Sequence, residues 1–462
     1  MISEEIKKSL RRAVGAENVL DSDIDRFGYS YDSSSMPILP AYKPDVVVLP
    51  TTAEEVSKVM AIAFAHGIPV TPRGAASNRT GGSVPLEGGI VLSLDRMTKI
   101  LELDEDNMMV TTEPGVRTID LYNYCAAKGL FFPPDPASWK VSTIGGNIAE
   151  NAGGMRAVKY GVVSDYVMAL EVVLADGTIL NTGGKAIKNV TGYDLKHLFT
   201  GSEGTLGIIT KATLKLIPMP KQRGTLQIMF KSLDAACATI QKMLQENIVP
   251  AAAEVMDKTS LDIVSKKRKV ILDPVIESCA IIEIDGEDQD ALDAQAKRIE
   301  AVASALGAVN FQVAQSQSES DELWAMRRGL SQAVAALAPN RIGEDIAVPR
   351  GSFPEVVRRI KKLGEKYDLT IVVYGHAGDG NLHPTVLCDY TDAELMERVH
   401  KAIDGIFEAA LAVGGTLSGE HGIGISKKPY IVQALGQAGV ETMKVIKQAL
   451  DPKGILNPGK IW

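Results

Sequence analysis

The stretch KPDVVVLPTTAEEVSKVMAIAFAHGIPVTPRG, residues 43–74, has the pattern of a single β-α-β unit. Two short apolar runs flank an amphipathic segment of helical period, and Thr51 followed by Glu54 predicts a capping box at the start of that helix. His66 is its expected last residue, because a glycine follows. The pattern predicts strands at 46–49 and 68–71 and therefore a chain that mixes helices with a sheet.

Further short strands, separated by glycine-rich turns, are expected up to about residue 220, in GGIVLSL, NMMVTTEPG, MALEVVLADG and GTLGIITKATLKLI. After Pro218 and Pro220 the pattern changes to alanine-rich helices such as LDAACATIQKMLQE, which alternate with strands such as SCAIIEIDG. From Asp392 onward we expect a long helix, the loop GGTLSGEHGIG, a second helix and an irregular tail. The expected fold class is α+β, in three segments with limits at 1–220, 221–400 and 401–462.

The composition argues against several classes of protein. The net charge is −8 and the basic residues are scattered, so nucleic acid is not an expected partner. The four cysteines lie far apart and form no C-x-x-C pair, which argues against disulfides, iron–sulfur clusters and structural zinc. No apolar run approaches the length of a membrane span and the first residues do not resemble a signal peptide, so we expect a cytoplasmic protein. No G-x-G-x-x-G follows a strand, so a Rossmann nicotinamide site is unsupported.

Two glycine-rich segments are candidates for binding a large anionic cofactor. TPRGAASNRTGGSVP, residues 71–85, follows a predicted strand and offers small residues whose backbone amides can form a concave nest for an anion. A flexible surface loop is the alternative interpretation of this segment. PPDPASWKVSTIGGNIAENAGG, residues 133–154, combines prolines, hydroxyl side chains and paired glycines. Such a segment can line a large planar ligand with backbone groups.

These segments, with GSEGTLGIIT at 201–210 and DPKGILNPGK at 451–460, resemble the FAD-linked oxidases of the vanillyl-alcohol oxidase type. The resemblance covers nearly the whole chain and is closest to D-lactate dehydrogenases, 2-hydroxyglutarate dehydrogenases and the FAD-bearing subunit of glycolate oxidase. It implies a PCMH-type FAD-binding domain at 1–220 and a substrate or cap domain with an antiparallel, ferredoxin-like sheet at 221–400. The segment 401–462 would then be helical, return to the FAD domain and complete the active site.

The resemblance also implies which residues bind FAD, namely Arg73, Gly74, Ala75, Ala76, Ser77, Asn78, Thr80, Gly81, Pro134, Asp135, Ser138, Thr143, Gly145, Gly146, Asn147, Asn151, Gly153, Gly204, Ile208 and Asn457. The loop at 71–85 contains less glycine than is usual in the family, so Ser77, Asn78 and Thr80 are expected to bind through side chains where other members use the backbone. Covalent members bond FAD through a histidine or cysteine. The loop contains neither, so we expect non-covalent FAD.

Two of the six histidines lie in GHAGDGNLHPTVL, on either side of a turn at 377–380. The flanking segments TIVVY and NLHPTVL predict two adjacent strands, and across a tight hairpin His376 and His383 can converge on one ion. Glu420, in SGEHGIG, is the best remaining candidate for a third ligand. Two histidines and a carboxylate suit Fe²⁺, Mn²⁺ or Zn²⁺. The resemblance implies the same three ligands and makes the next residue, His421, the catalytic base.

The expected reaction is the oxidation of a 2-hydroxy acid. A metal ion lowers the pKa of a coordinated alcohol, and neutral His421 could take its proton as a hydride leaves for FAD. Arg327, in ELWAMRRGL, matches the family's helix-borne arginine and would bind the substrate carboxylate, whereas Arg328 lies on another helix face and is expected to be solvated. Relatives that oxidise larger diacids carry a lysine shortly downstream. Only Arg341 is found there, which favours a small substrate, D-lactate or glycolate.

The reduced flavin must pass its electrons on, and the expected acceptor is another protein. The resemblance suggests an iron–sulfur subunit, a quinone or an electron-transferring flavoprotein, the last in some anaerobes as part of an electron-bifurcating lactate dehydrogenase complex. Two other functions stay open. A metal-dependent oxygenase would use the two histidines and the carboxylate directly, but it leaves both glycine-rich segments unexplained. A non-catalytic flavoprotein subunit of an electron-transfer complex would have no need for His421 beside Glu420.

Overall fold

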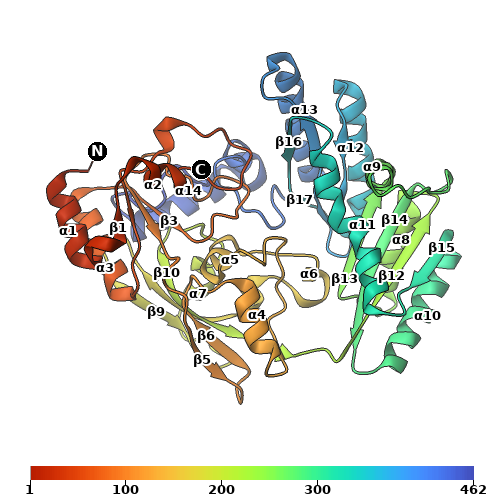
Figure 1. Ribbon diagram of the computed structural model, residues 1–462, viewed down its shortest axis with the longest axis horizontal. Coiled ribbons are helices and arrows are strands. Elements are labelled where there is room, and N and C mark those ends of the chain that lie inside the picture. Colours follow the sequence, from red (N-terminus) through yellow and green to blue (C-terminus); the bar gives the residue numbers. More distant parts are fainter. Residues whose placement is uncertain (1) are drawn as a thin grey trace. The chain divides into compact units, whose positions relative to one another are not determined.

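The computed structural model describes residues 2–462, and Figure 1 shows the course of the chain. Contacts divide it into two compact units. The first unit contains residues 2–154, Val162–Met219 and Glu420–Trp462, and the second contains Met155–Gly161 and Pro220–Gly419. The second unit is therefore an insertion into the first, which is built from three separate segments of the chain.

A four-stranded sheet in the first unit has the order β1-β2-β4-β3. β2 (Val46–Val48) and β3 (Val70–Arg73) lie parallel to β4 (Ile90–Ser93) on its two sides. α3 (Ala53–His66) connects β2 to β3, so the expected β-α-β unit is present with another strand between its two strands. β1 (Val19–Leu20) is antiparallel to β2, and α1 (Glu4–Val14) packs against α3. β3 is covered at the sheet edge by the end of the chain, because the Val70 N–H donates to Ile455 and the Val70 carbonyl accepts from Asn457.

The two ends of α3 differ by a residue or two from the sequence prediction. The N-cap is Thr52 rather than Thr51, and its side chain accepts from the Glu55 N–H at 3.2 Å. The Glu55 carboxylate in turn accepts from the Thr51 N–H at 2.6 Å. The glutamate that takes part in capping the helix is therefore Glu55 and not Glu54. At the other end Gly67 is left-handed and the Ile68 N–H returns to the Ala63 carbonyl. Ile68 is thus part of the helix end, and the strand begins at Val70 instead of Ile68.

The second sheet of the first unit is antiparallel and has five strands in the order β5-β6-β10-β8-β9. These are Ile100–Asp104, Met109–Thr112, Ile208–Lys215, Val167–Val173 and Ile179–Gly183. α4 (Thr118–Ala126) and α5 (Ile144–Glu150) share a hydrophobic core with this sheet. The remaining α-helices and strands of this unit are α2 (Asp23–Gly28), β7 (Leu130–Phe131), which pairs with β11 (Ile217–Pro218), α7 (Leu195–Phe199) and α14 (Ile431–Leu450).

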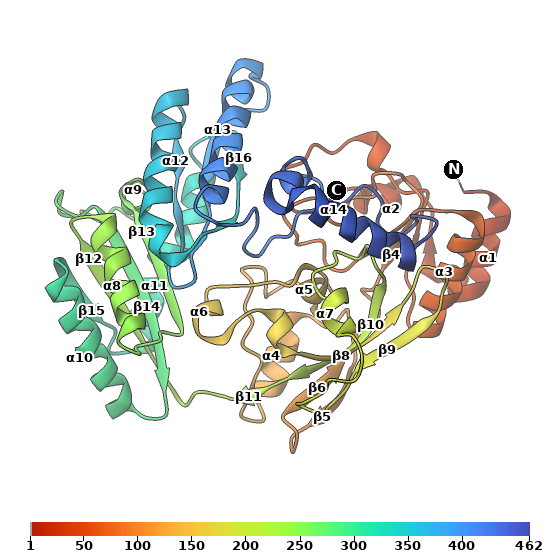
Figure 2. The same ribbon diagram turned by 180° about the vertical axis from the view of Figure 1, so that it is seen from behind.

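The second unit is built on a seven-stranded antiparallel sheet of order β15-β12-β14-β13-β19-β20-β17. Its strands are Ala308–Val313, Gln222–Phe230, Ser278–Gly286, Ala252–Asp257, Tyr374–His376, Asn381–Leu382 and Ile346–Ala347. Figure 2 shows α8 (Leu233–Gln245) and α10 (Gln289–Ala305) over one face of this sheet. Alternate residues of β14, such as Cys279 and Ile281, pack with α9 (Lys258–Arg268) and α11 (Gln317–Ala335). The expected antiparallel sheet with helices is therefore observed.

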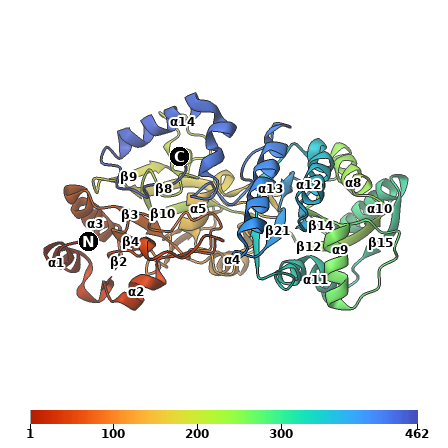
Figure 3. The same cartoon turned by 90° about the horizontal axis from the view of Figure 1, so that it is seen from above.

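The remaining elements of the second unit form a smaller layer. β16 (Asn340–Gly343), β21 (Thr385–Cys388) and β18 (Ile371–Val372) make a three-stranded sheet. α12 (Phe353–Tyr367) and α13 (Ala393–Leu411) lie side by side (Figure 3), and a Cβ at Gly405 would lie 2.7 Å from Leu363, so glycine permits this close approach.

The short segment Met155–Gly161, which contains α6 (Ala157–Tyr160), belongs to the second unit although the chain on either side belongs to the first. The Tyr160 hydroxyl donates to Asp285 at 2.5 Å, Lys159 pairs with the same carboxylate, and Arg156 lies 3.7 Å from Glu283. The sequence predicts these residues in the FAD-binding domain and does not predict that they contact the inserted unit. The expected limit at residue 401 also falls inside α13, whereas the units divide after Gly419.

Candidate active site

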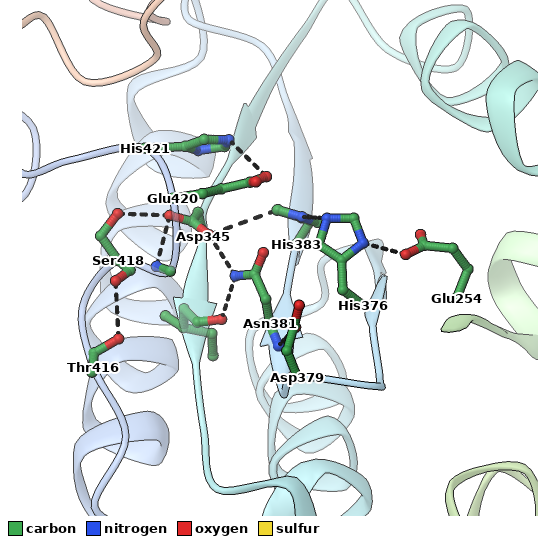
Figure 4. A network of polar contacts seen from close by, with 12 residues as sticks. Glu254, Asp345, His376, Asp379, Asn381, His383, Thr416, Ser418, Glu420 and His421 are labelled. Carbon is green, nitrogen blue, oxygen red and sulfur yellow. Dashed lines mark hydrogen bonds and ion pairs between the residues drawn. The ribbon is translucent and has the colours of Figure 1, made fainter. Parts of the chain in front are cut away.

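A tight β-hairpin brings His376 and His383 together (Figure 4). In the β19–β20 ladder His376 is opposite Asn381. Gly380, at φ +92°, closes the turn and donates its N–H to the His376 carbonyl at 2.9 Å. The two Nε2 atoms lie 3.3 Å apart, and both side chains are buried. Two imidazoles thus face each other in a site screened from water.

Glu420 is held near the histidines by the loop that precedes it. The fully buried Asp345 accepts hydrogen bonds from the Ser418 hydroxyl at 2.6 Å and from the Gly419 N–H at 3.0 Å. Its other oxygen accepts from the Asn381 side chain at 2.6 Å, and Asn381 belongs to the histidine hairpin. Glu420 directly follows Gly419 in the chain, so these hydrogen bonds fix the segment immediately before it.

The three expected ligands fit a divalent metal ion. His376, His383 and Glu420 each offer one ligand atom, and these atoms lie within 4.8 Å of one another. Metal–ligand bonds to histidine nitrogen and carboxylate oxygen are about 2.0–2.2 Å long, so an ion between these atoms could reach all three with small side-chain adjustments. Three ligands leave positions open for a substrate, and the two-histidine, one-carboxylate set is compatible with Fe²⁺, Mn²⁺ or Zn²⁺.

His421 directly follows the carboxylate ligand. Its Nε2 lies 3.8 Å from Glu420 Oε1, and its backbone carbonyl accepts from the Thr80 hydroxyl at 3.2 Å. Its side chain is about a quarter exposed, at 24 %. The backbone of His421 is therefore anchored, while part of its side chain remains accessible to solvent.

Arg327 and His376 share one buried carboxylate. Glu254, on β13, is 1 % exposed, accepts from Arg327 Nε at 2.6 Å and is hydrogen-bonded to His376 Nδ1. Burial alone would raise the pKa of Glu254, but His376 and Arg327 hold that pKa well below its usual range. The guanidinium carbon of Arg327 lies 4.5 Å from the centre of the Tyr374 ring. Arg328, in contrast, is 60 % exposed and pairs with Asp321.

The loop that follows β3 fits the phosphate part of a dinucleotide. Among the described residues the N–H groups of residues 74–80 donate to no protein acceptor. Ala75 is exposed, Ala76 has a positive φ of +52°, and the backbone is open to an anion. Arg73 donates to the Tyr31 carbonyl at 2.8 Å and Asn78 donates to Asp32 at 2.7 Å. Those two side chains therefore anchor the loop to the N-terminal segment.

The middle of the second glycine-rich segment, at Thr143, contacts the start of this loop, at Gly74. Thr143 is the N-cap of α5, and a Cβ at Gly74 would overlap the Thr143 hydroxyl, so only glycine permits this approach. Asp135 lies against Gly154, where a Cβ would be 2.5 Å from the Asp135 carbonyl. Gly153 lies against Glu420, with 3.2 Å between its added Cβ and that of Glu420. The expected FAD segment thus reaches the expected metal ligand.

Three further segments close around the loop at 74–82. Asn457 donates its side-chain amide to the carbonyls of Gly82 and Glu203, at 2.9 and 2.7 Å. Gly204, at φ +68°, lies against Pro72, where a Cβ would collide. The carbonyl of Thr80 accepts from the Ile425 N–H at 2.8 Å. The structure thus gathers residues from both glycine-rich segments, the 201–210 motif and the 451–460 motif.

Several of the expected FAD residues have side chains with structural contacts. Ile208 is buried in the core under the four-stranded sheet, and Asn147 donates to the Thr118 hydroxyl at 2.7 Å. Asn151, left-handed at the end of α5, accepts from the Ser164 N–H at 2.8 Å. Ser138 accepts two backbone hydrogen bonds at its carbonyl, and Pro134 is buried. The side chains of Ile208 and Asn147 are therefore engaged in the protein interior.

Two buried carboxyl groups near this loop escaped the sequence analysis. Glu150 and Glu203 both approach Gly82 and Gly422, and Glu203 accepts from the N–H groups of Ile423 and Gly424, each at 2.7 Å. Burial, the neighbouring Glu203 and Asp32 raise the pKa of Glu150 well above its usual value, against the opposing effect of Lys427. The protonated form of Glu150 is therefore favoured by its surroundings in the folded protein.

Glu254 and Asp345 also escaped the sequence analysis, since each is an acidic residue in a short strand or loop with no recognisable motif around it. A single glutamate inside the apolar run AAAEVM is a weak signal that a buried cation or imidazole lies opposite. Its partners, on strands and helices far along the chain, have no local pattern that would identify them.

The chain matches two protein-family models. The model "FAD binding domain" matches residues 44–183, and the model "FAD linked oxidases, C-terminal domain" matches residues 219–461. Glycolate oxidase subunit GlcD of Bacillus subtilis (strain 168) is 44 % identical to this chain, over 100 % of this chain and 97 % of its own. D-lactate dehydrogenase of Anaerostipes hadrus is 37 % identical over 95 % and 93 %. D-lactate dehydrogenase of Archaeoglobus fulgidus is 38 % identical over 94 % and 95 %.

Solved structures show the same fold at low sequence identity. p-Cresol methylhydroxylase with substrate bound superposes with a TM-score of 0.82 and 20 % identity, over 99 % of this chain and 96 % of that chain. 4-Ethylphenol oxidase from Gulosibacter chungangensis gives a TM-score of 0.80 and 22 % identity, over 100 % and 98 %. Over the described part of the chain, no helix has the length and apolar character needed to span a membrane.

Proposed function

Because this chain belongs to the FAD-linked oxidases and is an FAD-dependent oxidoreductase with the two-domain PCMH-type fold, we propose that it oxidises a small D-2-hydroxy acid, D-lactate or glycolate, to the 2-oxo acid with the help of a divalent metal ion. The observation that carries the proposal is the group of His376, His383 and Glu420, connected through Glu254 to Arg327. The relatives named glycolate oxidase subunit and D-lactate dehydrogenase support the substrate class.

When bound, FAD accepts a hydride and a divalent ion lowers the pKa of a coordinated alcohol. His376, His383 and Glu420 would hold the ion, and the backbone of residues 74–80 would hold the pyrophosphate of non-covalent FAD. Gly145, Gly146 and Gly153 would line the flavin with backbone surface that has no side chains.

The substrate carboxylate would bind to Arg327. Its Nε is used by Glu254, which leaves the two terminal nitrogens to form a paired contact with a carboxylate. The ring of Tyr374 supports the plane of the guanidinium. Arg341, the cation that the sequence places nearest to a second carboxylate, donates to the Ser331 carbonyl. A substrate with one carboxylate is therefore favoured.

His421 would take the hydroxyl proton. Neutral imidazole is a suitable base near neutral pH, and the ring lies next to the carboxylate ligand with part of its surface exposed. The proton can then pass to water, while the two electrons leave through FAD. Because all four cysteines of the chain are buried and none offers an iron–sulfur site, the electrons would pass to a protein partner, an iron–sulfur subunit or an electron-transferring flavoprotein.

The deciding experiment is a visible absorption spectrum of anaerobically purified protein, recorded before and after D-lactate or glycolate, with and without a chelator. The proposal predicts flavin bands that bleach with substrate and stay oxidised after metal removal, and flavin that is released by acid. Bands that stay oxidised with both acids and with 2-hydroxyglutarate contradict the substrate assignment. Bleaching that survives complete metal removal contradicts the role of the metal. Protein that shows no flavin bands after incubation with FAD would instead support the oxygenase.

A further inference from the structure

Glu254 contacts both an expected metal ligand, His376, and the expected substrate arginine, Arg327. β13 and β19 pair so that Glu254 is opposite His376, and α11 presents Arg327 to the same carboxylate. The side chain of Glu254 is 1 % exposed, and each of its two oxygens has its own partner, Oε1 with His376 and Oε2 with Arg327. No part of this carboxylate is left for solvent.

This contact determines which nitrogen of His376 is available. Since Nδ1 faces the carboxylate, it carries the proton, and the lone pair is at Nε2, which points toward the Nε2 of His383. A carboxylate that accepts from the far nitrogen of a metal-binding histidine fixes the orientation of the ring and strengthens the ligand. His383 has a weaker version of the same arrangement, because its Nδ1 lies 3.9 Å from Asp345.

The same contact also fixes Arg327. With Nε bound to Glu254 and the guanidinium over the Tyr374 ring, the plane of Arg327 has one orientation. An ion at His376 and a carboxylate at Arg327 are therefore held at a separation that one side chain sets. A 2-hydroxy acid, which has its hydroxyl on the carbon next to its carboxylate, needs a short and constant separation between these two contacts.

We propose that Glu254 is a positioning residue that couples the metal site to the substrate-carboxylate site. Its one carboxylate determines both the affinity for the metal ion and the orientation of the Arg327 guanidinium. The inference rests on the proposed function. It goes further by assigning the spacing between the two binding groups, and with it the preference for a 2-hydroxy over a 3-hydroxy acid, to this residue.

The substitution Glu254→Gln tests the coupling because it keeps the shape and removes one acceptor. A glutamine amide has one acceptor oxygen and one donor nitrogen, whereas His376 Nδ1–H and Arg327 Nε–H are both donors. One of the two partners must lose its hydrogen bond in the variant. We expect the dissociation constant for Mn²⁺, measured on flavin-loaded protein by competition with a chelator, to rise roughly 10- to 100-fold.

Glu283→Gln is the matched control, since it removes a half-buried carboxylate from the next strand of the same sheet, where Glu283 is opposite Ala252 and 3.7 Å from Arg156. It should leave the affinity for Mn²⁺ within about twofold, well short of the change expected when a carboxylate behind a ligand is lost. Arg327→Lys should also leave Mn²⁺ affinity nearly unchanged while raising KM for the hydroxy acid. Glu254→Gln should change both, and adding Arg327→Lys to it should raise KM by less than the product of the single effects.

The possible results are distinguishable. If the unsubstituted protein binds no Mn²⁺, Co²⁺ or Zn²⁺, the proposed function is wrong and the coupling with it. If that protein binds Mn²⁺ and Glu254→Gln binds it equally tightly, the coupling is wrong and the proposed function stands. Where Glu254→Gln fails to fold, Glu254→Asp takes its place. The aspartate side chain is one methylene shorter, so it should retain one of the two contacts. The variant should therefore either bind Mn²⁺ more weakly or have a higher KM. Unchanged values of both overturn the inference.

Discussion

His376 and His383 turn their Nε2 atoms toward each other at 3.3 Å, and each has a buried carboxylate on its other side, Glu254 for His376 and Asp345 for His383. With Glu420, these carboxylates concentrate acidic groups around the two imidazoles. A divalent cation would offset the charge of the carboxylates, and this balance is the basis of the first prediction.

Replacement of His383 by asparagine should abolish tight metal binding, because a carboxylate and one imidazole remain as ligands. Metal content after dialysis should fall below a tenth of that of the unsubstituted protein, and substrate should no longer bleach the flavin, while bound FAD should be unchanged. His400→Asn, at an exposed position of α13, is the control and should behave like the unsubstituted protein. Equal metal content in His383→Asn and His400→Asn would contradict the ligand assignment.

Arg327→Lys should raise KM for D-lactate or glycolate with a smaller effect on metal content. Lysine keeps the charge but loses the planar fork and its contact with Glu254, so we expect kcat/KM to fall about 10- to 100-fold, the range for a lost charged hydrogen bond. Arg328→Lys, one residue along and 60 % exposed, should leave kcat/KM within about twofold, as for surface substitutions. Steady-state rates with an artificial electron acceptor measure both, and similar losses in the two variants would refute the assignment.

Glu150→Gln should stabilise the flavin-free protein in a pH-dependent way. The folded-state pKa of Glu150 is raised by burial and by Glu203 and Asp32, so the folded protein favours the protonated acid. Its contribution to stability is present below the unfolded pKa of about 4.3 and is lost as the pH rises through the folded pKa. Glutamine cannot ionise. The variant should therefore melt close to the unsubstituted protein at pH 4.5 and at a higher temperature at pH 8.

The melting temperature, recorded by circular dichroism across this range, measures the effect. Glu87→Gln, at an exposed position of the same unit, should show no such trend with pH. A difference between Glu150→Gln and the unsubstituted protein that is constant from pH 4.5 to pH 8 would show that Glu150 is ionised in the folded state.

Gly145→Ala and Gly146→Ala should separate packing from cofactor binding. A Cβ at Gly145 would lie 2.5 Å from the Pro114 Cβ, so overpacking should destabilise that variant by about 1–3 kcal/mol. At Gly146 the nearest atom to an added Cβ is the Thr143 hydroxyl, at 3.2 Å, and the chain should tolerate alanine there. If Gly146 lines the flavin, its variant should bind FAD more weakly in a fluorescence titration while unfolding normally. Unchanged FAD affinity would move the flavin away from this glycine.

Local patterns were sufficient for many elements. α13 begins after Asp392 because that side chain caps the Leu395 N–H at 2.9 Å, and the hairpin around His376 follows from two short strands and a glycine turn. The β-α-β unit was also readable, although its helix cap lay one residue further on. In each case the deciding interactions lie within a few residues of each other.

What the sequence did not reveal depends on partners far along the chain. Met155–Gly161 joins the second unit through Asp285 and Glu283, which the motif around it does not predict. The contact between Glu254 and His376 depends on the register of β13 and β19, which places the two residues opposite each other. The candidate metal ligands were recognisable because glycine-rich turns and rare histidines stand out, whereas the carboxylates behind them occupy ordinary strand and loop positions.

During synthesis on the ribosome, the first unit cannot be completed until the last residues of the chain, which pair with β3, have been made. β3 lies at the edge of its sheet, and its Val70 is paired with Ile455 and Asn457, which are synthesised after the whole inserted unit. Pro220–Gly419 is continuous in sequence and can fold first, while the backbone groups of β3 remain available to other chains. Removing residues 451–462 should thus produce an insoluble product, since an exposed strand edge is a template for aggregation.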